Sequence, residues 1–169
     1  MKKRVLVILV LYVSLLGISS CGIYSFTGAS IHPEAKTVNI KRFPNMAPMV
    51  NPSLSQEFTE ALQEKFQRQT SLILVDGSAD YEFEGEIVGY STSPVAIQGD
   101  ETAAMNRLTI TVNVRFSNRF NEDENFEQRF GRYVDYDSNR NLSEIESELV
   151  KQINEVIVED IFNKAVVNW

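Results

Sequence analysis

Residues 108–117 alternate between apolar and polar side chains, and this pattern constrains the fold more than any other stretch of the sequence. The apolar positions are Leu108, Ile110, Val112, Val114 and Phe116. Because a β-strand points successive side chains to opposite faces, the pattern predicts a strand with one face in the core and one in solvent. Such a strand needs partner strands at its edges and a second layer over its apolar face. We therefore expect it to be the central strand of a covered sheet.

Other segments also have strand character. The alternating segments are residues 37–43, 81–89 and 126–136, and a short apolar run at 72–75 predicts a brief strand. The second segment places Glu82, Glu84 and Glu86 on one face and aromatic or apolar side chains on the other. Gly85 and Gly89 interrupt its apolar face, where a glycine indicates a bulge or a close approach of two backbones.

Two amphipathic helices are predicted. The first has Asn51 as its N-cap and Pro52 at its first helical position, and it ends near Thr70. Its apolar stripe consists of Leu54, Phe58, Ala61, Leu62 and Phe66. The second helix opens with a capping box formed by Ser143 and Glu146. Its predicted buried stripe consists of Ile145, Leu149, Ile153, Val156 and Ile157.

These elements follow the order β-α-β-β-β-α. The order and patterning predict an α+β fold, a two-layer sandwich with two helices packed on one face of a mostly antiparallel sheet of about four strands. Residues 91–105, between the second and third long strands, are long for a hairpin connection and include Pro94 and Gly99. A loop of this length is either functional or disordered, and the sequence leaves both interpretations open.

The first 20 residues have the order of a bacterial signal peptide: a cationic start at 1–4, an apolar run at 5–16 and a cleavable region at 17–20. At about 1.5 Å of helical rise per residue, the apolar run spans roughly 18 Å, well short of the roughly 30 Å of a bilayer core. The sequence Ile-Ser-Ser-Cys at 18–21 is a lipobox. It predicts cleavage before Cys21 and acylation of that thiol.

Cys21 is the only cysteine of the chain, so no internal disulfide can form. Acylation removes a thiol that would otherwise be exposed in an oxidising compartment, and several acyl chains make a lasting membrane anchor. The alternative is an ordinary signal peptide that precedes a free thiol. We expect a signal peptide at 1–20, a lipidated cysteine and tether at 21–33, and a single domain at 34–169.

The side-chain inventory argues against catalysis. The chain carries 23 Asp and Glu against 16 Lys and Arg, a net charge of −7, which disfavours nucleic-acid binding because phosphate neutralisation supplies most of that affinity. His32 is the only histidine and lies in the predicted tether. Without a second histidine or a spare cysteine, the usual zinc sites and nucleophile–histidine pairs lack their residues. No metal, cofactor or catalytic residue is predicted.

Four strings of the sequence resemble the LptE family of lipopolysaccharide-assembly lipoproteins, in its divergent, non-enteric branch. They are CGIYSFTG at 21–28, NPSLS at 51–55, NRLTITV at 106–112, and the closing stretch from DIFN at 160–163 to Trp169. The resemblance implies a partner, the β-barrel translocon subunit LptD, whose lumen the domain occupies as a plug, and contact with lipopolysaccharide. The enteric family's basic lipid-contact positions have no clear match here, so none is transferred.

The residues after the cysteine bear on location. Gly22 replaces the aspartate that retains enteric lipoproteins in the inner membrane, and residues 22–26 lack an acidic surface-export tag. Both absences favour the outer membrane, with the acylated protein facing the periplasm. Two rival functions remain open: a generic envelope lipoprotein that binds some other protein, and a hydrolase that uses two carboxylates.

Two groups of residues are candidates for binding. Val95 and Ile97, in the predicted loop 91–105, are candidates for contact with the barrel. Arg107, Arg115 and Arg129 are candidates for lipid phosphate, which guanidinium groups bind through two parallel hydrogen bonds. Salt bridges to the glutamate row at 82, 84 and 86 are the favoured alternative role for these arginines.

Overall fold

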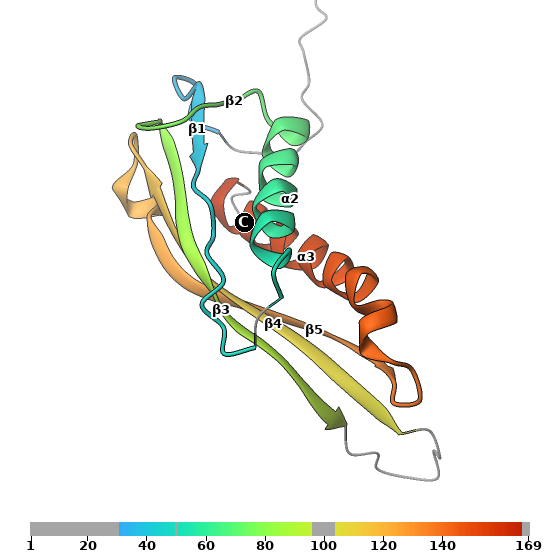
Figure 1. Cartoon of the computed structure of the whole chain (residues 1–169). Coiled ribbons are helices and arrows are strands. Elements are labelled where there is room, and N and C mark those ends of the chain that lie inside the picture. Colours follow the sequence, from blue (N-terminus) through green and yellow to red (C-terminus); the bar gives the residue numbers. More distant parts are fainter. Residues whose placement is uncertain (1–30, 50, 96–103, 167–169) are drawn as a thin grey trace, which may run out of the picture.

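The computed structural model describes residues 31–49, 51–95 and 104–166; the predicted signal peptide and Cys21 lie outside these ranges. Its elements are β1 (Thr37–Ile40), α2 (Leu54–Gln69), β2 (Ile73–Leu74), β3 (Tyr81–Val95), β4 (Met105–Asn118), the short 3₁₀ helix η1 (Glu122–Glu124), β5 (Phe126–Asp137) and α3 (Leu142–Val166). Figure 1 shows them in chain order. The predicted α+β fold is confirmed, with the brief strand at 72–75 present as β2.

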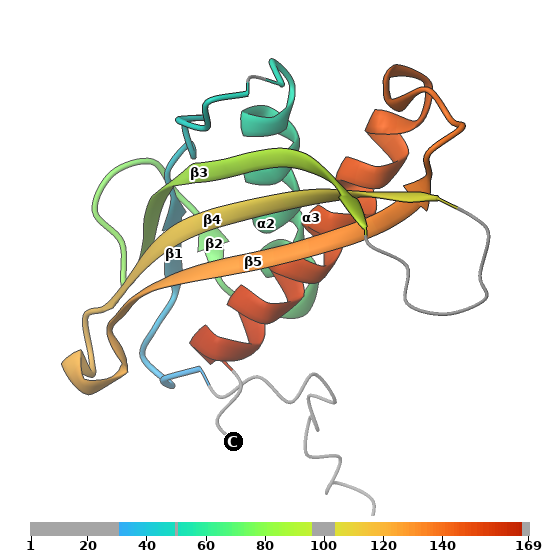
Figure 2. The same ribbon diagram turned by 90° about the horizontal axis from the view of Figure 1, so that it is seen from below.

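The five strands form one sheet in the order β2-β1-β3-β4-β5. The β1 strand runs parallel to both β2 and β3, whereas β3, β4 and β5 are antiparallel. Both helices lie on one face of the sheet, behind the long strands in Figure 2. As predicted, β4 is central: Val112 pairs with Ile87 of β3 on one side and with Phe130 of β5 on the other.

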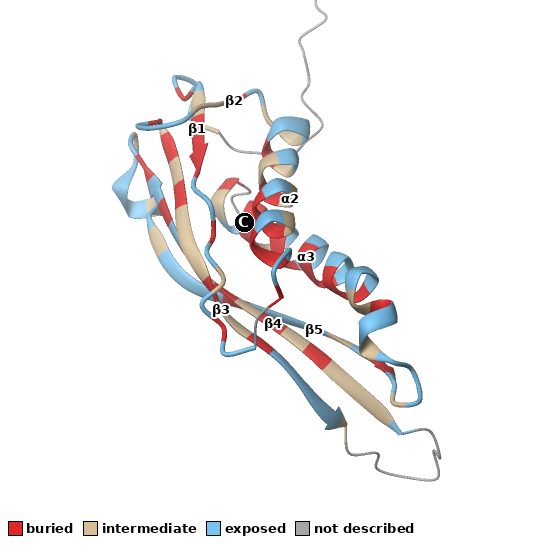
Figure 3. Cartoon of the chain, viewed as in Figure 1, coloured by how far each residue is buried: buried red, intermediate tan, exposed pale blue. Residues whose placement is uncertain are grey.

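The core lies between the sheet and the two helices (Figure 3). All five apolar positions of β4 are buried. Aromatic contacts join the layers, because the ring of Phe66 on α2 lies 4.8 Å from that of Phe83 on β3 and 5.1 Å from that of Phe162 on α3. One side chain thus links the sheet to both helices.

The glycines of β3 mark a bulge and a close approach, as predicted. The pairing of β3 with β4 shifts register between Ile87 and Gly89. The shift aligns Gly89 with Thr111 on the polar face, so its predicted place on the apolar face was wrong. At Gly85, an added Cβ would lie 2.0 Å from the carbonyl oxygen of Asn113. The chain after β1 also touches the bulge, since the Ile87 N–H donates to the carbonyl of Pro44 at 2.9 Å.

The predicted start of the first helix was wrong by two residues. The helix begins at Leu54, and Pro52 lies in a preceding turn. Asn51 still caps it, because its side-chain oxygen accepts the N–H groups of Ser53 and Leu54 at 3.0 Å each.

The predicted capping box of the second helix was also wrong. Asn141 takes that place, and its side-chain oxygen accepts the N–H and the hydroxyl of Ser143 at 3.2 and 3.0 Å. Glu146 instead accepts a hydrogen bond from the hydroxyl of Tyr90 on β3. In the predicted buried stripe, Val156 is 46% exposed, because α2 packs on the side of α3 that carries Asn154 and Val158.

The predicted long loop at 91–105 was wrong at both ends. The β3 strand continues to Val95, which pairs with Met105 of β4, so residues 91–95 are strand. Serine and threonine are compatible with a strand that pairs on one side, and proline is tolerated at a sheet edge. Val95 therefore ends a strand, and Ile97 lies outside the described residues.

The N-terminal segment packs against the domain from Ile31 onward. The ring of His32 stacks on that of Phe120 at 4.4 Å, and the backbone N–H of His32 donates to the hydroxyl of Tyr81 at 3.1 Å. The carboxylate of Asp80 accepts hydrogen bonds from the N–H groups of Lys36 and Thr37, which lower its pKa. His32 has a structural role in these contacts.

Candidate functional site

The face of β3, β4 and β5 that points away from the helices is open to solvent in the described part of the chain, and we call it the open face (Figure 2). The strand register aligns its side chains in rows of three. These rows are Glu84–Arg115–Glu127, Glu86–Asn113–Arg129, Gly89–Thr111–Gly131, Ser91–Thr109–Tyr133 and Ser93–Arg107–Asp135. All three candidate arginines lie on this face.

Arg115 lies between two carboxylates. Its guanidinium contacts Glu84 at 2.8 Å and Glu127 at 3.1 Å. Lys41 also contacts Glu84 at 2.8 Å, and the hydrogen bonds from Lys41 and Arg115 lower the pKa of that carboxyl. The salt bridge to the glutamate row, the alternative role predicted for Arg115, is present, so lipid phosphate would have to compete with two carboxylates.

Arg107 is also paired, but not with the glutamate row. It contacts both carboxylate oxygens of Asp135, at 2.7 and 2.9 Å, and this pairing lowers the pKa of Asp135. The guanidinium carbon lies 3.6 Å from the ring centroid of Tyr133. The strand register explains why Arg107 pairs with Asp135 and not with a glutamate, because it aligns Arg107 with Asp135 and Ser93.

Arg129 differs from the other two arginines. It is exposed on β5 and makes no ion pair with any described residue. Its neighbour in the row is Asn113, whose amide donates to Glu127 at 3.2 Å. Of the three candidates, Arg129 alone can meet an anion without breaking an ion pair seen in the described structure.

The middle of the open face has little side-chain bulk. Thr111 is flanked by Gly89 and Gly131, where an added Cβ would lie 3.1 Å and 3.3 Å from atoms of the threonine side chain. Tyr133 is 54% exposed in the adjacent row. Sequence reasoning did not single out Tyr133. The signal was available, because the alternation of residues 126–136 places this aromatic residue on the polar face.

The end of the sheet that carries Val95 forms a second group, which we call the distal end: residues 91–95 of β3 and 105–108 of β4. Residues 91–94 are exposed, and β1 pairs only with the opposite end of β3. Arg107 belongs to the distal end. Arg115 lies eight residues further along β4, which is roughly 27 Å at about 3.4 Å per residue.

Neither metal chemistry nor a membrane-spanning helix is evident in the residues that the structure describes. Within them, no three His, Cys, Asp or Glu side chains gather in a way that could hold a metal ion. Of the helices seen in the described ranges, none is long and apolar enough to cross a bilayer.

Comparison with solved structures shows related folds at low identity. A neuraminyllactose-binding hemagglutinin homolog from Helicobacter pylori matches with a TM-score of 0.52 and 11% identity over 83% of this chain and 88% of that chain. A minor lipoprotein from Acinetobacter baumannii matches with a TM-score of 0.44 and 14% identity, over 74% and 91%. The rare lipoprotein B from Shewanella oneidensis matches with a TM-score of 0.43 and 13% identity, over 72% and 89%. Of these three, the match with a TM-score of 0.52 bears on the fold, and on the fold alone.

Among curated proteins, none matches the chain significantly. A family model does: the model described as LptE, lipopolysaccharide-assembly, matches residues 35–165. The match covers every helix and strand that the structure describes, apart from the final residue of α3. It supports a non-enzymatic role and confirms the resemblance drawn from the four sequence strings. The chain therefore belongs to the LptE lipopolysaccharide-assembly family.

Proposed function

We propose that this protein is an outer-membrane lipoprotein, anchored through acylated Cys21 and facing the periplasm. In this proposal it assembles with an LptD-type β-barrel as a plug and helps deliver lipopolysaccharide to the outer leaflet. Family membership supports the role in lipopolysaccharide assembly. The observation that carries the partner assignment is the open face, with its distal end.

A plug must present an extended surface of hydrogen-bonding groups to a barrel wall. The β3, β4 and β5 strands are 15, 14 and 12 residues long, whereas β1 has 4 residues. The long strands therefore reach well past β1 and α2 (Figure 1). At the distal end, the polar side chains of residues 91–93 are exposed next to a strand edge that pairs with no other described strand. Val95 stays a candidate for barrel contact, as part of a strand.

Lipid contact is proposed first for Arg129. A guanidinium binds a phosphate through paired, charge-assisted hydrogen bonds, and it does so most readily where no carboxylate already occupies it. Arg107 and Arg115 are paired with carboxylates at 2.7 to 3.1 Å. We therefore rank these two below Arg129. Charge reversal at Arg129 should weaken lipopolysaccharide binding more than charge reversal at Arg107.

A pull-down tests the partner. The full chain, tagged at its C-terminus, is purified from detergent-solubilised outer membranes, and co-purifying proteins are identified by mass spectrometry. A large β-barrel present in near-equal amount is the expected result. Repeated purification of the tagged chain without any barrel protein would favour the rival function, an envelope lipoprotein that binds another partner.

The anchor has its own test. Cys21 is the only cysteine, so the Cys21→Ala variant should lose all metabolic label from a clickable fatty acid. Undiminished label on the variant would overturn the lipoprotein assignment. Loss of label with retained barrel binding would separate anchoring from assembly.

A further inference from the structure

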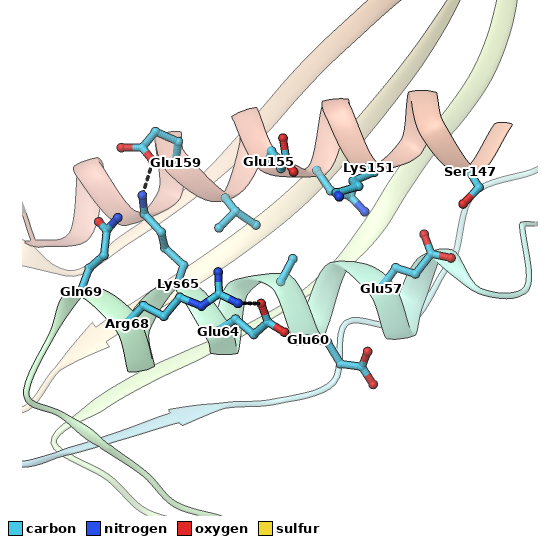
Figure 4. A pocket seen from close by; sticks show the side chains of 13 residues that line it. Glu57, Glu60, Glu64, Lys65, Arg68, Gln69, Ser147, Lys151, Glu155 and Glu159 are labelled. Atoms are coloured by element: carbon cyan, nitrogen blue, oxygen red, sulfur yellow. Dashed lines mark hydrogen bonds and ion pairs between the residues drawn. The ribbon is translucent and has the colours of Figure 1, made fainter. Parts of the chain in front are cut away.

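The two helices enclose a groove on the side of the molecule away from the open face (Figure 4). α2 and α3 contribute side chains to it along their length, and its volume is about 550 Å³. On α2 its lining runs from Glu57 to Gln69, which is roughly 18 Å at about 1.5 Å per residue. The groove is therefore elongated and within the roughly 300–1,000 Å³ typical of binding sites.

The groove carries excess negative charge. Two ion pairs neutralise part of its lining, Lys65 with Glu159 and Arg68 with Glu64. The remaining charged side chains are three carboxylates, Glu57, Glu60 and Glu155, and one cation, Lys151. None of these four makes an ion pair with a described residue. Glu57 and Glu60 lie on α2, and Glu155 lies across the groove on α3.

A buried polar side chain lines the same groove. Asn154 is 3% exposed, in the middle of α3 between Ile153 and the buried Val158. Its side-chain oxygen is closed to solvent and has no hydrogen-bond donor among the described residues. A buried amide oxygen is costly without a donor, and a leucine would pack at this position without that cost. The orphan acceptor and the surplus carboxylates both favour a ligand that brings N–H donors and positive charge.

We propose that the α2–α3 groove binds a basic segment of a protein partner. Lysine or arginine side chains of that segment pair with the carboxylates of Glu57, Glu60 and Glu155, which are spread along the two helices (Figure 4). One of these cations donates a hydrogen bond to the Asn154 oxygen when the amide turns toward the groove. The length of the groove favours a peptide chain with several spaced cations over a compact cation. This site goes beyond the proposed barrel contact and lies on the opposite side of the domain, so either can fail without the other.

Peptide binding tests the proposal. The full chain is purified in a non-ionic detergent and titrated against a fluorescein-labelled peptide of alternating lysine and alanine, read by fluorescence anisotropy at about 0.1 M salt, where screening acts beyond about 10 Å. We expect saturable binding. The triple variant E57Q/E60Q/E155Q should bind at least about tenfold more weakly, since each exposed pair contributes modestly.

A matched variant separates the groove from general attraction to an acidic protein. E122Q/D123N/E144Q removes the same charge from exposed positions outside the groove and should leave peptide affinity unchanged. Loss of affinity equal to that of the groove variant would overturn the proposal. So would spermidine binding as tightly as the peptide, because that result would assign the groove to small cations.

Asn154→Leu tests the orphan acceptor. The variant should melt no lower than the wild type, because an unsatisfied amide is replaced by an apolar side chain of similar size, and it should bind the peptide several-fold more weakly. If its affinity equals that of the wild type, the hydrogen bond to Asn154 is absent and the proposed mode of binding is wrong.

Discussion

The two faces of the β3–β4–β5 sheet are built from alternate residues of the same strands, yet they are constrained differently. The inner face holds Val112 and its apolar neighbours, all buried against the helices. The open face holds arginines and carboxylates in rows, and it has little side-chain bulk at Thr111, which lies between two glycines. Burial fixes the inner residues, because a cavity or an unpaired charge there is costly. Surface substitutions change stability little, so the open face is the one that can vary to suit a partner.

The sharpest test of this contrast places the same carboxylate on each face of β4. Val112→Asp buries an unpaired charge, which costs several kcal/mol, comparable with the ~5–15 kcal/mol stability of a whole domain. Thr109→Asp, three residues earlier on the open face, should leave the melting temperature nearly unchanged. Thermal melts by circular dichroism measure both. A Val112→Asp melt within a degree or two of the wild type would refute the placement of β4 in the core.

A smaller difference in stability is expected between alanine variants of two glycines, one on each face. In Gly85→Ala, the new Cβ meets a backbone carbonyl at 2.0 Å and the Phe43 ring at 2.8 Å, so the sheet must shift at a cost of about 1–3 kcal/mol. In Gly131→Ala, the nearest atom is the Thr111 hydroxyl at 3.3 Å, and a change within about 0.5 kcal/mol is expected. Urea denaturation of both variants measures the difference. Equal losses would show that the two faces are equally constrained.

The smallest effect should come from an ion pair on the open face. Lys41 and Arg115 hold the pKa of Glu84 below its usual value. A lowered folded-state pKa stabilises the protein above the unfolded value, about 4.3, and this gain is lost as the pH falls through the folded value. Glu84→Gln should therefore lower the melting temperature by a few degrees at pH 7 and have little effect near pH 3. Melts across this range would contradict the linkage if the difference grew in acid.

Sequence reasoning predicted those parts of the fold in which burial imposes a period. The strict alternation of β4 identified a central strand, since only period 2 keeps Leu108 through Phe116 on one face. It missed the extension of β3 to Val95, because Ser91 to Pro94 form an exposed edge whose conformation is set by pairing with β4, a contact between distant segments.

The candidate site was predictable in part for the same reason. The arginines on the polar positions of β4 and β5 were identified from the alternation, but the choice of Asp135 as the partner of Arg107 depends on strand register. The groove that includes Asn154 depends on two helices far apart in sequence. No local pattern distinguishes a glutamate in solvent from one in the wall of such a groove.

Site-specific photo-crosslinking in intact cells tests most directly whether the partner contact lies on the sheet. A benzophenone side chain is placed at Val95, at the distal end, and in a matched variant at Gln67, an exposed position of α2 outside the helix groove. We predict an adduct of barrel size from Val95 and little or none from Gln67. An adduct from Gln67 with none from Val95 would show that the helical side, and not the distal end of the sheet, meets the barrel.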